Sequence, residues 1–374
     1  MQLLGILAFI FALLFSVMVH EFGHYLTARR FGMRVSEFFL GFGKRLWSRQ
    51  RGETEFGIKA IPAGGYCRIE GMTPDDEMPE GESHRAFYLA SSAKKLIVLS
   101  AGSFLHFVLG FILLFTLFIG IGTNQVLPVI SEVVPNSAAQ AAGIQAGDEI
   151  VSINGNKVVE WYKDVEAIRD SQGADLTLEI NRDGQLLTVV TQARLTDIDG
   201  TKRYVLGIVN DVGLKRSGLL LSIKNSAIVT RDFLTESVRS LGKLPEKIPA
   251  LWGATVRGEE RDANGLVGVV GVARVSGEAV GSDKLTPMER LATFVLIVAS
   301  LNIFVGVFNL LPILPLDGGH MAVAIADSIR AFFARLRGRP RPAPIDVTVL
   351  TPITMVVFVV LATLTLLLLV ADVI

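Results

Sequence analysis

The sequence predicts an α+β protein that crosses a membrane four times and carries one soluble domain. Only 19% of the 374 residues are charged, against about 25% in an ordinary soluble protein. The deficit is confined to four charge-free stretches, at 1–19, 96–131, 291–316 and 347–371. Each stretch is long enough to span a bilayer, which takes about 20 residues. The composition therefore excludes a purely soluble domain, a disordered chain and an ectodomain with a single anchor.

Charge balance and cysteine content limit the partners that we expect. The 36 basic and 36 acidic residues cancel, so the net charge gives no reason to expect a nucleic-acid partner. The single cysteine, Cys67, cannot form an intrachain disulfide. Residues 1–19 lack the basic start and the small-residue cleavage site of a signal peptide, so we expect a retained helix there.

Lysine and arginine predict the orientation of the spans, because cytoplasmic loops are enriched in both. Segment 28–95 contains twelve of them. The connection between the third and fourth spans contains Arg330, Arg335, Arg337, Arg339 and Arg341. We expect both segments to be cytoplasmic, so that both chain termini and the segment between the second and third spans lie outside.

The first cytoplasmic segment is predicted to form strands and turns. Residues 54–61 alternate between polar and apolar side chains, and the run 62–66 (Pro-Ala-Gly-Gly-Tyr) is expected to break that strand. Residues 38–43 are apolar and include two glycines, and residues 51–53 fit a turn. The acidic, proline-containing residues 73–83 are expected to form a surface loop.

The outer segment is predicted to be a small domain of strands and short helices. Strands are expected at 129–134 and 149–154, with a tight turn at Asn154-Gly155. A short helix is expected at 137–142, capped by Asn136 or Ser137 and ended by Gly143.

The rest of the outer segment is expected to be helical around one hairpin. Residues 158–170 are predicted to be helical, and 175–193 to form a hairpin that turns at Asp183-Gly184. An amphipathic helix broken by Pro245 and Pro249 is expected over 222–256. We divide the chain into a first membrane core, an outer domain, a helical segment and a second membrane core, at 1–123, 124–212, 213–290 and 291–374.

The strongest chemical signal is the run His20-Glu21-Phe22-Gly23-His24. On a helix, residues four apart share a face, so both imidazoles can reach one zinc ion. Glu21 is offset by one residue and can accept a proton from a zinc-bound water, whose pKa is lowered to about 7. The alternative is two unrelated helix histidines, although the chain has only five histidines in all.

Helix geometry predicts the depth of this motif. If the first helix runs to Ala28, His24 and His20 lie about 8 and 14 Å from the basic boundary, at about 1.5 Å per residue. The metal would then lie inside the bilayer, toward the cytoplasm. An ionisable residue at membrane depth costs free energy, so we expect Glu21 to have a function there. A soluble zinc protease is the competing interpretation.

A catalytic zinc usually has a third protein ligand, and the run from Asn309 to His320 offers Asp317. Pro312 and Pro315 are expected to stop the third helix. Gly318-Gly319 would let the backbone approach closely. The alternatives are a plain turn at the membrane surface, or His320 as the ligand in place of Asp317.

Two other polar residues within the apolar stretches have open roles. His106 could line the cavity or form a hydrogen bond within the helices. Asn309 could hold an unwound substrate strand, or form an interhelical hydrogen bond instead.

Together these motifs resemble the site-2 protease family of intramembrane zinc metalloproteases (M50 type), over nearly the whole chain. His20-Glu21-x-x-His24 is similar to the first family signature, and the segment 309–318 (Asn-x-x-Pro-x-x-Pro-Leu-Asp-Gly) to the second. Residues 41–66 resemble the membrane-associated β-loop of the family. The second span differs, because His106 stands where an asparagine is often found.

The outer segment 135–155 is similar to a bacterial PDZ domain. A single such domain between the second and third spans resembles the Rip-type regulators of actinobacteria. The full expectation is thus an α+β polytopic protein of the bacterial cell membrane, with four transmembrane helices, a β-loop and an extracytoplasmic PDZ domain.

The resemblance implies a zinc ion held by His20, His24 and Asp317, with Glu21 as general base. It implies substrate contacts by Asn309, and we extend them to Pro312 and Gly43. The implied reaction is regulated intramembrane proteolysis of single-pass membrane proteins, with anti-sigma factors as substrates, after an upstream site-1 protease. A peptide or protein C-terminus is the expected PDZ ligand. The alternatives are an inactive zinc-binding PDZ scaffold and a metal transporter.

Overall fold

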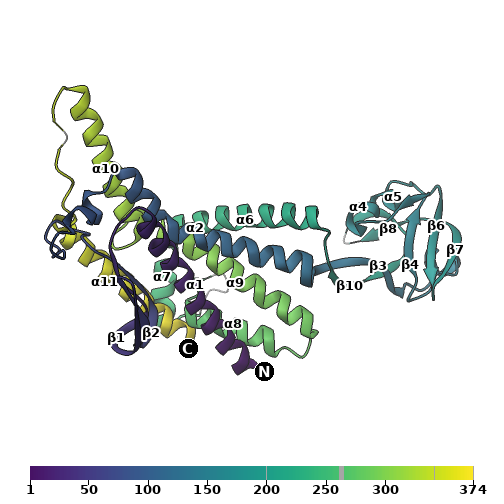
Figure 1. Ribbon diagram of the computed structural model, residues 1–374. Coiled ribbons are helices and arrows are strands. Elements are labelled where there is room, and N and C mark those ends of the chain that lie inside the picture. The colour runs from purple at the N-terminus through teal and green to yellow at the C-terminus, as the bar shows by residue number, and fades with distance from the viewer. Residues whose placement is uncertain (199, 261–264, 341, 374) are drawn as a thin grey trace. The chain divides into compact units, whose positions relative to one another are not determined.

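The computed structural model describes residues 1–198, 200–260, 265–340 and 342–373 (Figure 1). These residues form two compact units, here called the helical unit (1–120 with 218–374) and the sheet unit (121–217). The combination of helices with antiparallel strands confirms the predicted α+β class.

Four helical segments in the described part of the chain are long and apolar enough to cross a membrane, which confirms the predicted number. They are α1 (Gln2–Arg30), α2 (Ser92–Thr116) with the turn Leu117–Ile121, α9 (Pro287–Asn309), and α11 (Thr351–Val373) with the turn Val347–Leu350. The second span ends inside the charge-free stretch 96–131, near the boundary expected at residue 123. Gly122 has a positive φ of 98° and ends the helix, and a strand begins at Thr123.

Helices α1, α2 and α9 pack directly on one another. Glycines allow the close approach: a methyl group on Gly23 of α1 would lie 2.6 Å from the carbonyl oxygen of Ala101 in α2. A methyl group on Gly110 of α2 would lie 2.8 Å from Cγ1 of Ile303 in α9. Small residues at such crossings are the usual basis of helix packing in membranes.

Strands β1 (Val35–Arg51) and β2 (Thr54–Ile69) form an antiparallel ribbon against α1. Phe39 of β1 is opposite both Gly57 and Tyr66, so the two halves of β2 lie on either side of β1. The predicted break at 62–66 therefore bends β2 back without ending it. The two short 3-10 turns Ser83–Arg85 and Phe87–Leu89 follow the acidic loop.

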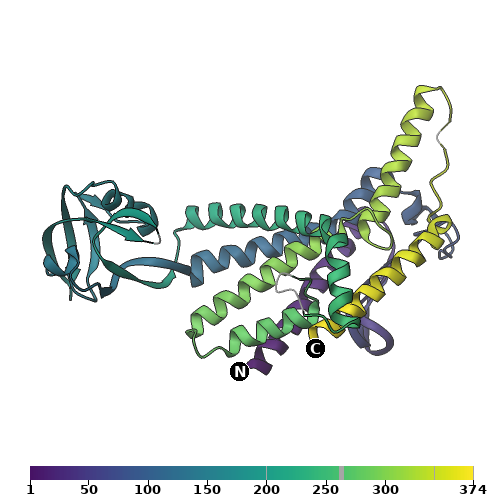
Figure 2. The same cartoon turned by 180° about the vertical axis from the view of Figure 1, so that it is seen from behind.

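Three helices follow the sheet unit and pack on the spanning helices. They are α6 (Leu219–Gly242), α7 (Leu244–Val256) and α8 (Val269–Gly281). Both views show α6 alongside α2 (Figures 1 and 2), and α8 contacts α1 and α9. The expected break at Pro249 is wrong, because this proline lies inside α7 and removes one backbone donor without ending the helix.

The connection between the third and fourth spans begins as a helix, α10 (Asp317–Leu336). A basic loop was expected there. α10 packs on α2 through its first half, and the chain returns through residues 337–346 to α11.

The sheet unit has its own core and an antiparallel sheet in the order β10-β3-β4-β6-β7, with β5 paired to β4. The strands and short helices are β3 (Thr123–Val133), α3 (Ala138–Ala141), β4 (Glu149–Ile153), β5 (Asn156–Lys157), α4 (Trp161–Asp164), α5 (Glu166–Arg169), β6 (Asp175–Arg182), β7 (Gln185–Gln192), β8 (Arg194–Ile198), β9 (Thr201–Val205) and β10 (Ile208–Lys215).

Most local predictions for this unit are confirmed. The Ser137 side chain caps α3 by accepting from the Gln140 amide, and Gly143 follows with φ 74°. The 175–193 hairpin turns at Asp183-Gly184. The segment predicted to be helical over 158–170 forms α4 and α5, which are separated at Val165. It begins at Trp161, after a turn in which Asp164 accepts from the amides of Val159 and Glu160.

Candidate metal centre

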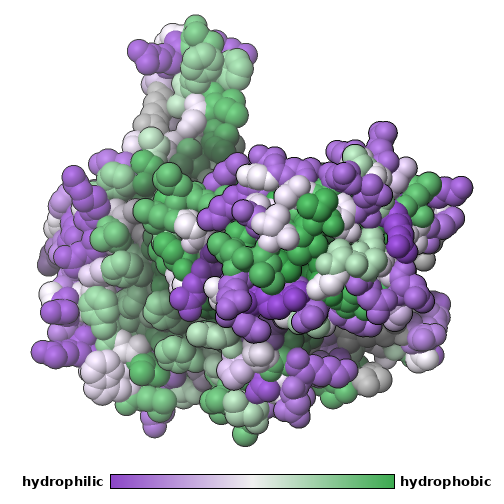
Figure 3. Space-filling view, turned by 90° about the vertical axis from the view of Figure 1, so that its right-hand side faces the viewer, coloured by the Kyte–Doolittle hydropathy of each residue, from purple (hydrophilic) through white to green (hydrophobic). Residues whose placement is uncertain are grey.

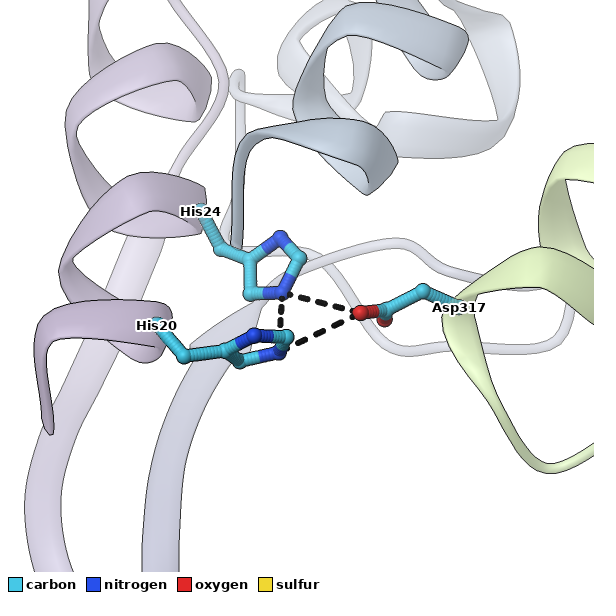
Figure 4. A group of neighbouring side chains, drawn as sticks. All are labelled: His20, His24 and Asp317. Atoms are coloured by element: carbon cyan, nitrogen blue, oxygen red, sulfur yellow. Dashed lines mark hydrogen bonds and ion pairs between the residues drawn. The ribbon is translucent and has the colours of Figure 1, made fainter. Parts of the chain in front are cut away.

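Three side chains from the two ends of the chain meet in the helical unit (Figure 4). His20 and His24 are one turn apart on α1, and each is 7% exposed. Asp317 is the first residue of α10. The Nε2 atoms of the two histidines are 3.0 Å apart, and Asp317 Oδ2 lies 3.2 Å from His20 Nε2 and 3.4 Å from His24 Nε2.

This geometry fits a tetrahedral metal ion. Two ligand atoms at 2.0–2.1 Å from a tetrahedral zinc are about 3.3 Å apart, close to the three distances found. Asp317 Oδ2 is buried and makes no hydrogen bond with any described residue. A buried acceptor without a donor is costly, and a cation between the three atoms would remove that cost. Two imidazoles and a carboxylate are also typical zinc ligands.

The surroundings orient both imidazoles. His24 Nδ1 donates to the carbonyl oxygen of Val98 at 2.8 Å, which leaves the Nε2 lone pair pointing to the centre. The His20 ring lies on Gly102 of α2, where a methyl group would come within 2.5 Å of the ring. The contacts of Val98 and Gly102 with the histidines were not predicted, because they depend on how α1 and α2 pack.

The loop between α9 and α10 brings Asp317 to the histidines. α9 ends at Asn309, before Pro312 and Pro315, as predicted. A methyl group on Gly318 would lie 2.2 Å from the carbonyl oxygen of Leu311, and one on Gly319 would lie 2.5 Å from the amide of Leu314. The two glycines therefore allow the close backbone approach that the sequence predicts.

Glu21 lies on α1 beside the bent half of β2. A methyl group on Gly65 would lie 2.5 Å from Glu21 Cγ, and the carboxylate is near the backbone of Cys67. The structure thus places the predicted base between the histidine pair and a strand edge.

The three predicted substrate-contact residues lie outside the histidine–aspartate cluster. Among the described residues, no hydrogen bond or ion pair joins Asn309, Pro312 or Gly43 to that cluster. Asn309 ends α9 and is partly exposed, and Pro312 is exposed in the loop. Gly43 is on β1, near Ile61. His320 is not in the cluster, so the geometry favours Asp317 over this rival.

His106 forms a hydrogen bond between two helices, which is the second of the two roles that the sequence left open. Its Nδ1 lies 2.9 Å from Asn302 Oδ1 of α9. The Asn302 amide nitrogen donates to the Val298 carbonyl, so Oδ1 faces the imidazole as an acceptor. The His106 ring also lies 5.0 Å from the His20 ring, centre to centre. His106 therefore links α2 and α9 directly behind His20.

Comparison with known proteins identifies the family. The model of peptidase family M50 matches residues 8–359. The chain belongs to this family. Zinc metalloprotease Rip1 of Mycobacterium tuberculosis is 33% identical over 93% of this chain and 92% of its own length. Zinc metalloprotease Rip1 of Mycolicibacterium smegmatis is 34% identical with the same coverage.

This M50 peptidase is a zinc metalloprotease of the membrane type, as the family match, the relatives and the four apolar helices agree. Zinc is the metal of the family, and the donor set found here suits it.

Proposed function

We propose that this M50 peptidase cleaves single-pass membrane proteins within the bilayer, as the second cut of regulated intramembrane proteolysis. The observation that carries the proposal is the buried cluster of His20, His24 and Asp317 within a bundle of spanning helices. A zinc protease site surrounded by lipid-facing helices can reach only substrates that enter from the membrane or its surface.

Glu21 acts as the general base in this proposal. His20, His24 and Asp317 would hold the zinc ion, and zinc would lower the pKa of a bound water molecule. Glu21 takes the proton as the water oxygen attacks the peptide carbonyl carbon. The same carboxyl group then gives the proton to the amine nitrogen when the C–N bond breaks.

The bent half of β2 supplies a place for the substrate. Residues 65–69 pair with β1 on one side only and pass Glu21 through Gly65. An extended peptide can add to such an edge through backbone hydrogen bonds. The partly exposed Asn309 amide and the exposed Pro312 are available beyond the metal centre, and Gly43 lies further along the ribbon.

The sheet unit fits the proposed PDZ domain. It has a groove of about 750 Å³ beside the edge strand β10, lined by Trp161, Val165 and Ile168 on the helical side. A peptide C-terminus of a trimmed substrate or partner would add to β10 there. The twelve basic residues at 28–95 favour a cytoplasmic location for this segment. In the proposed topology the sheet unit and both termini would then lie outside.

Anti-sigma factors remain the proposed substrate class, with a site-1 protease making the first cut outside. This assignment rests on the resemblance to Rip-type regulators.

Replacing Glu21 by Gln tests the proteolytic mechanism. The amide cannot accept the proton, so we expect cleavage of a single-pass reporter in proteoliposomes to fall about 10²–10⁴-fold. Zinc content by elemental analysis should stay at the wild-type level, because the three proposed ligands are intact. Undiminished cleavage contradicts the mechanism. Zinc flux with no cleavage in the wild-type protein would favour a transporter, and neither activity would favour a scaffold.

Comparative membrane proteomics then identifies the substrates. Cells that carry the Glu21→Gln protein should accumulate single-pass proteins already trimmed outside. Accumulation of untrimmed proteins alone contradicts the proposed order of the two cuts.

A further inference from the structure

From Ile325 onward, α10 has an apolar face that the other described residues leave exposed. The face consists of Ile325, Ile329, Phe332, Phe333 and Leu336, which are 45–67% exposed. At 100° per residue these five side chains fall within an arc of about 100°. The other side of the helix carries the buried Ala324 and Asp327 and packs toward α2. The exposed face is thus a continuous stripe that points away from the protein.

Arginines border this stripe on both sides. Helix geometry puts Arg335 on one side and both Arg330 and Arg337 on the other, and Arg339 follows the helix end. No acidic residue occurs in the sequence 328–345. Figure 3 shows apolar side chains along the projecting helix and hydrophilic ones at its far end.

Residues of the apolar stripe and bordering arginines line a common hollow. It has a volume of about 590 Å³ and is lined by Ile329, Phe333, Ala334, Arg330, Arg337, Arg339, Pro340 and Pro342. Three arginines and several apolar residues therefore line the same hollow. Guanidinium groups bind phosphate with paired hydrogen bonds, and the apolar residues suit an acyl chain.

We propose that residues 325–339 lie in the headgroup layer of the membrane and bind anionic phospholipids. The apolar stripe contacts acyl chains, and the bordering arginines contact lipid phosphates. Charge complementarity selects an anionic surface, since the only ion pair of these four arginines with another described residue joins Arg330 to Asp327 at 3.4 Å. The bilayer is within reach, because α10 lies between the spanning helices α9 and α11. This proposal does not depend on the zinc chemistry.

Spin-label accessibility tests the position of the stripe. The full chain with Cys67→Ser receives one new labelling site, Phe333→Cys, or Ala343→Cys as the control on the exposed return segment. In bilayers that contain phosphatidylglycerol, the label at 333 should collide mainly with dissolved oxygen, and the label at 343 mainly with a water-soluble nickel chelate. Equal exposure of both labels to the nickel chelate overturns the proposal.

Lipid binding tests the charge. The variant Arg330→Gln, Arg335→Gln, Arg337→Gln, Arg339→Gln is compared with the control variant Arg203→Gln, Arg216→Gln, Arg231→Gln, Arg239→Gln, whose arginines are exposed elsewhere. Native mass spectrometry should show preferential binding of phosphatidylglycerol over phosphatidylcholine. The preference should fall about fivefold per arginine removed from α10 and stay unchanged in the control.

Equal losses in the two variants, or no loss in the α10 variant, overturn the lipid assignment. Displacement of phosphatidylglycerol by soluble polyglutamate at an equal concentration of carboxylates also overturns it, because the surface would then suit an acidic protein partner.

Discussion

Gly102 has no side chain, and the imidazole of His20 occupies the space that one would fill. A Cβ atom at this position would lie 2.5 Å from Cε1 and 2.7 Å from Nε2 of His20. Carbon atoms in proteins do not approach this closely, so either the ring or the α2 backbone would have to move. The metal centre therefore depends on a residue that cannot itself bind metal.

Replacing Gly102 by Ala should weaken zinc binding. A displaced His20 ring no longer points Nε2 at the other two donors, and we expect a loss of at least about tenfold in zinc affinity, as for other changes next to metal ligands. Titration with a competing chelator measures it. Gly120→Ala is the matched control on the same helix, since nothing lies within 4 Å of its Cβ position. An equal effect of both variants contradicts the prediction.

Asp148 of the sheet unit is a residue whose neighbours shift its pKa. Its carboxylate is 1% exposed and accepts two hydrogen bonds of 2.7 Å from Arg182 and one from the Gln145 amide. The Arg182 guanidinium lowers the pKa of Asp148 below its usual value. The ionised form is therefore favoured by folding.

This lowered pKa predicts a pH dependence of stability. The contribution of Asp148 is present above its unfolded pKa of about 3.9 and is lost as the pH falls through the lower folded value. Hydrogen exchange of the sheet unit in the intact protein should show destabilisation below about pH 4. Asp148→Asn should be less stable near neutral pH and lose less on acidification. A variant with the wild-type pH slope contradicts this assignment.

At the scale of elements, the bent strand β2 couples the ribbon to the proposed base. Gly65 is the point of contact, because only a residue without Cβ fits against Glu21 Cγ. The three atoms nearest to a methyl group on Gly65 belong to Glu21 and Val17, and none belongs to a histidine. Binding of metal and positioning of the base are thus served by different elements, α2 and β2.

Gly65→Ala should separate the two roles. The methyl group displaces the Glu21 side chain, and we expect cleavage to fall at least about tenfold, as for a misplaced catalytic group, while zinc content is unchanged. Arg49→Ala, an exposed position on β1 away from this segment, is the control and should keep full cleavage. Zinc loss in the Gly65 variant would show that the base and the metal ligands are not separately held.

Sequence patterns predicted the elements better than their contacts. Charge-free runs located the four spans, and helical spacing paired His20 with His24. Proline and glycine located the loop before Asp317. The missed features, namely Gly102 beneath His20, the Val98 carbonyl and the link from His106 to Asn302, arise where two helices meet. A periodic pattern shows which face of a helix is buried and does not show which residue of the next helix lies against it.

At the scale of the molecule, the chain contains a unit with its own core. In the sheet unit, side chains such as Ile130, Leu176 and Leu178 are fully buried and pack only within residues 121–217. The strands also find all their described partners within this unit. Its fold therefore has no need of the spanning helices.

The fragment 121–217 should fold when expressed alone. We expect a cooperative urea transition with a free energy of unfolding of about 5–10 kcal/mol, usual for this size. Fluorescence of Trp161, the only tryptophan of the fragment and 7% exposed, reports it. Leu178→Asn should abolish the transition, and Leu186→Asn, 70% exposed, should preserve it. A gradual change without a midpoint contradicts independent folding.

The metal centre joins α1, near the start of the chain, to α10, in its last fifth. During synthesis, His20 and His24 enter the membrane early, and Asp317 is added only after the sheet unit and α9 have been made. A growing or prematurely terminated chain therefore has only two of the three metal ligands, and the ligand cluster cannot form. The order of the elements along the chain therefore delays the complete ligand cluster until α10 has been made.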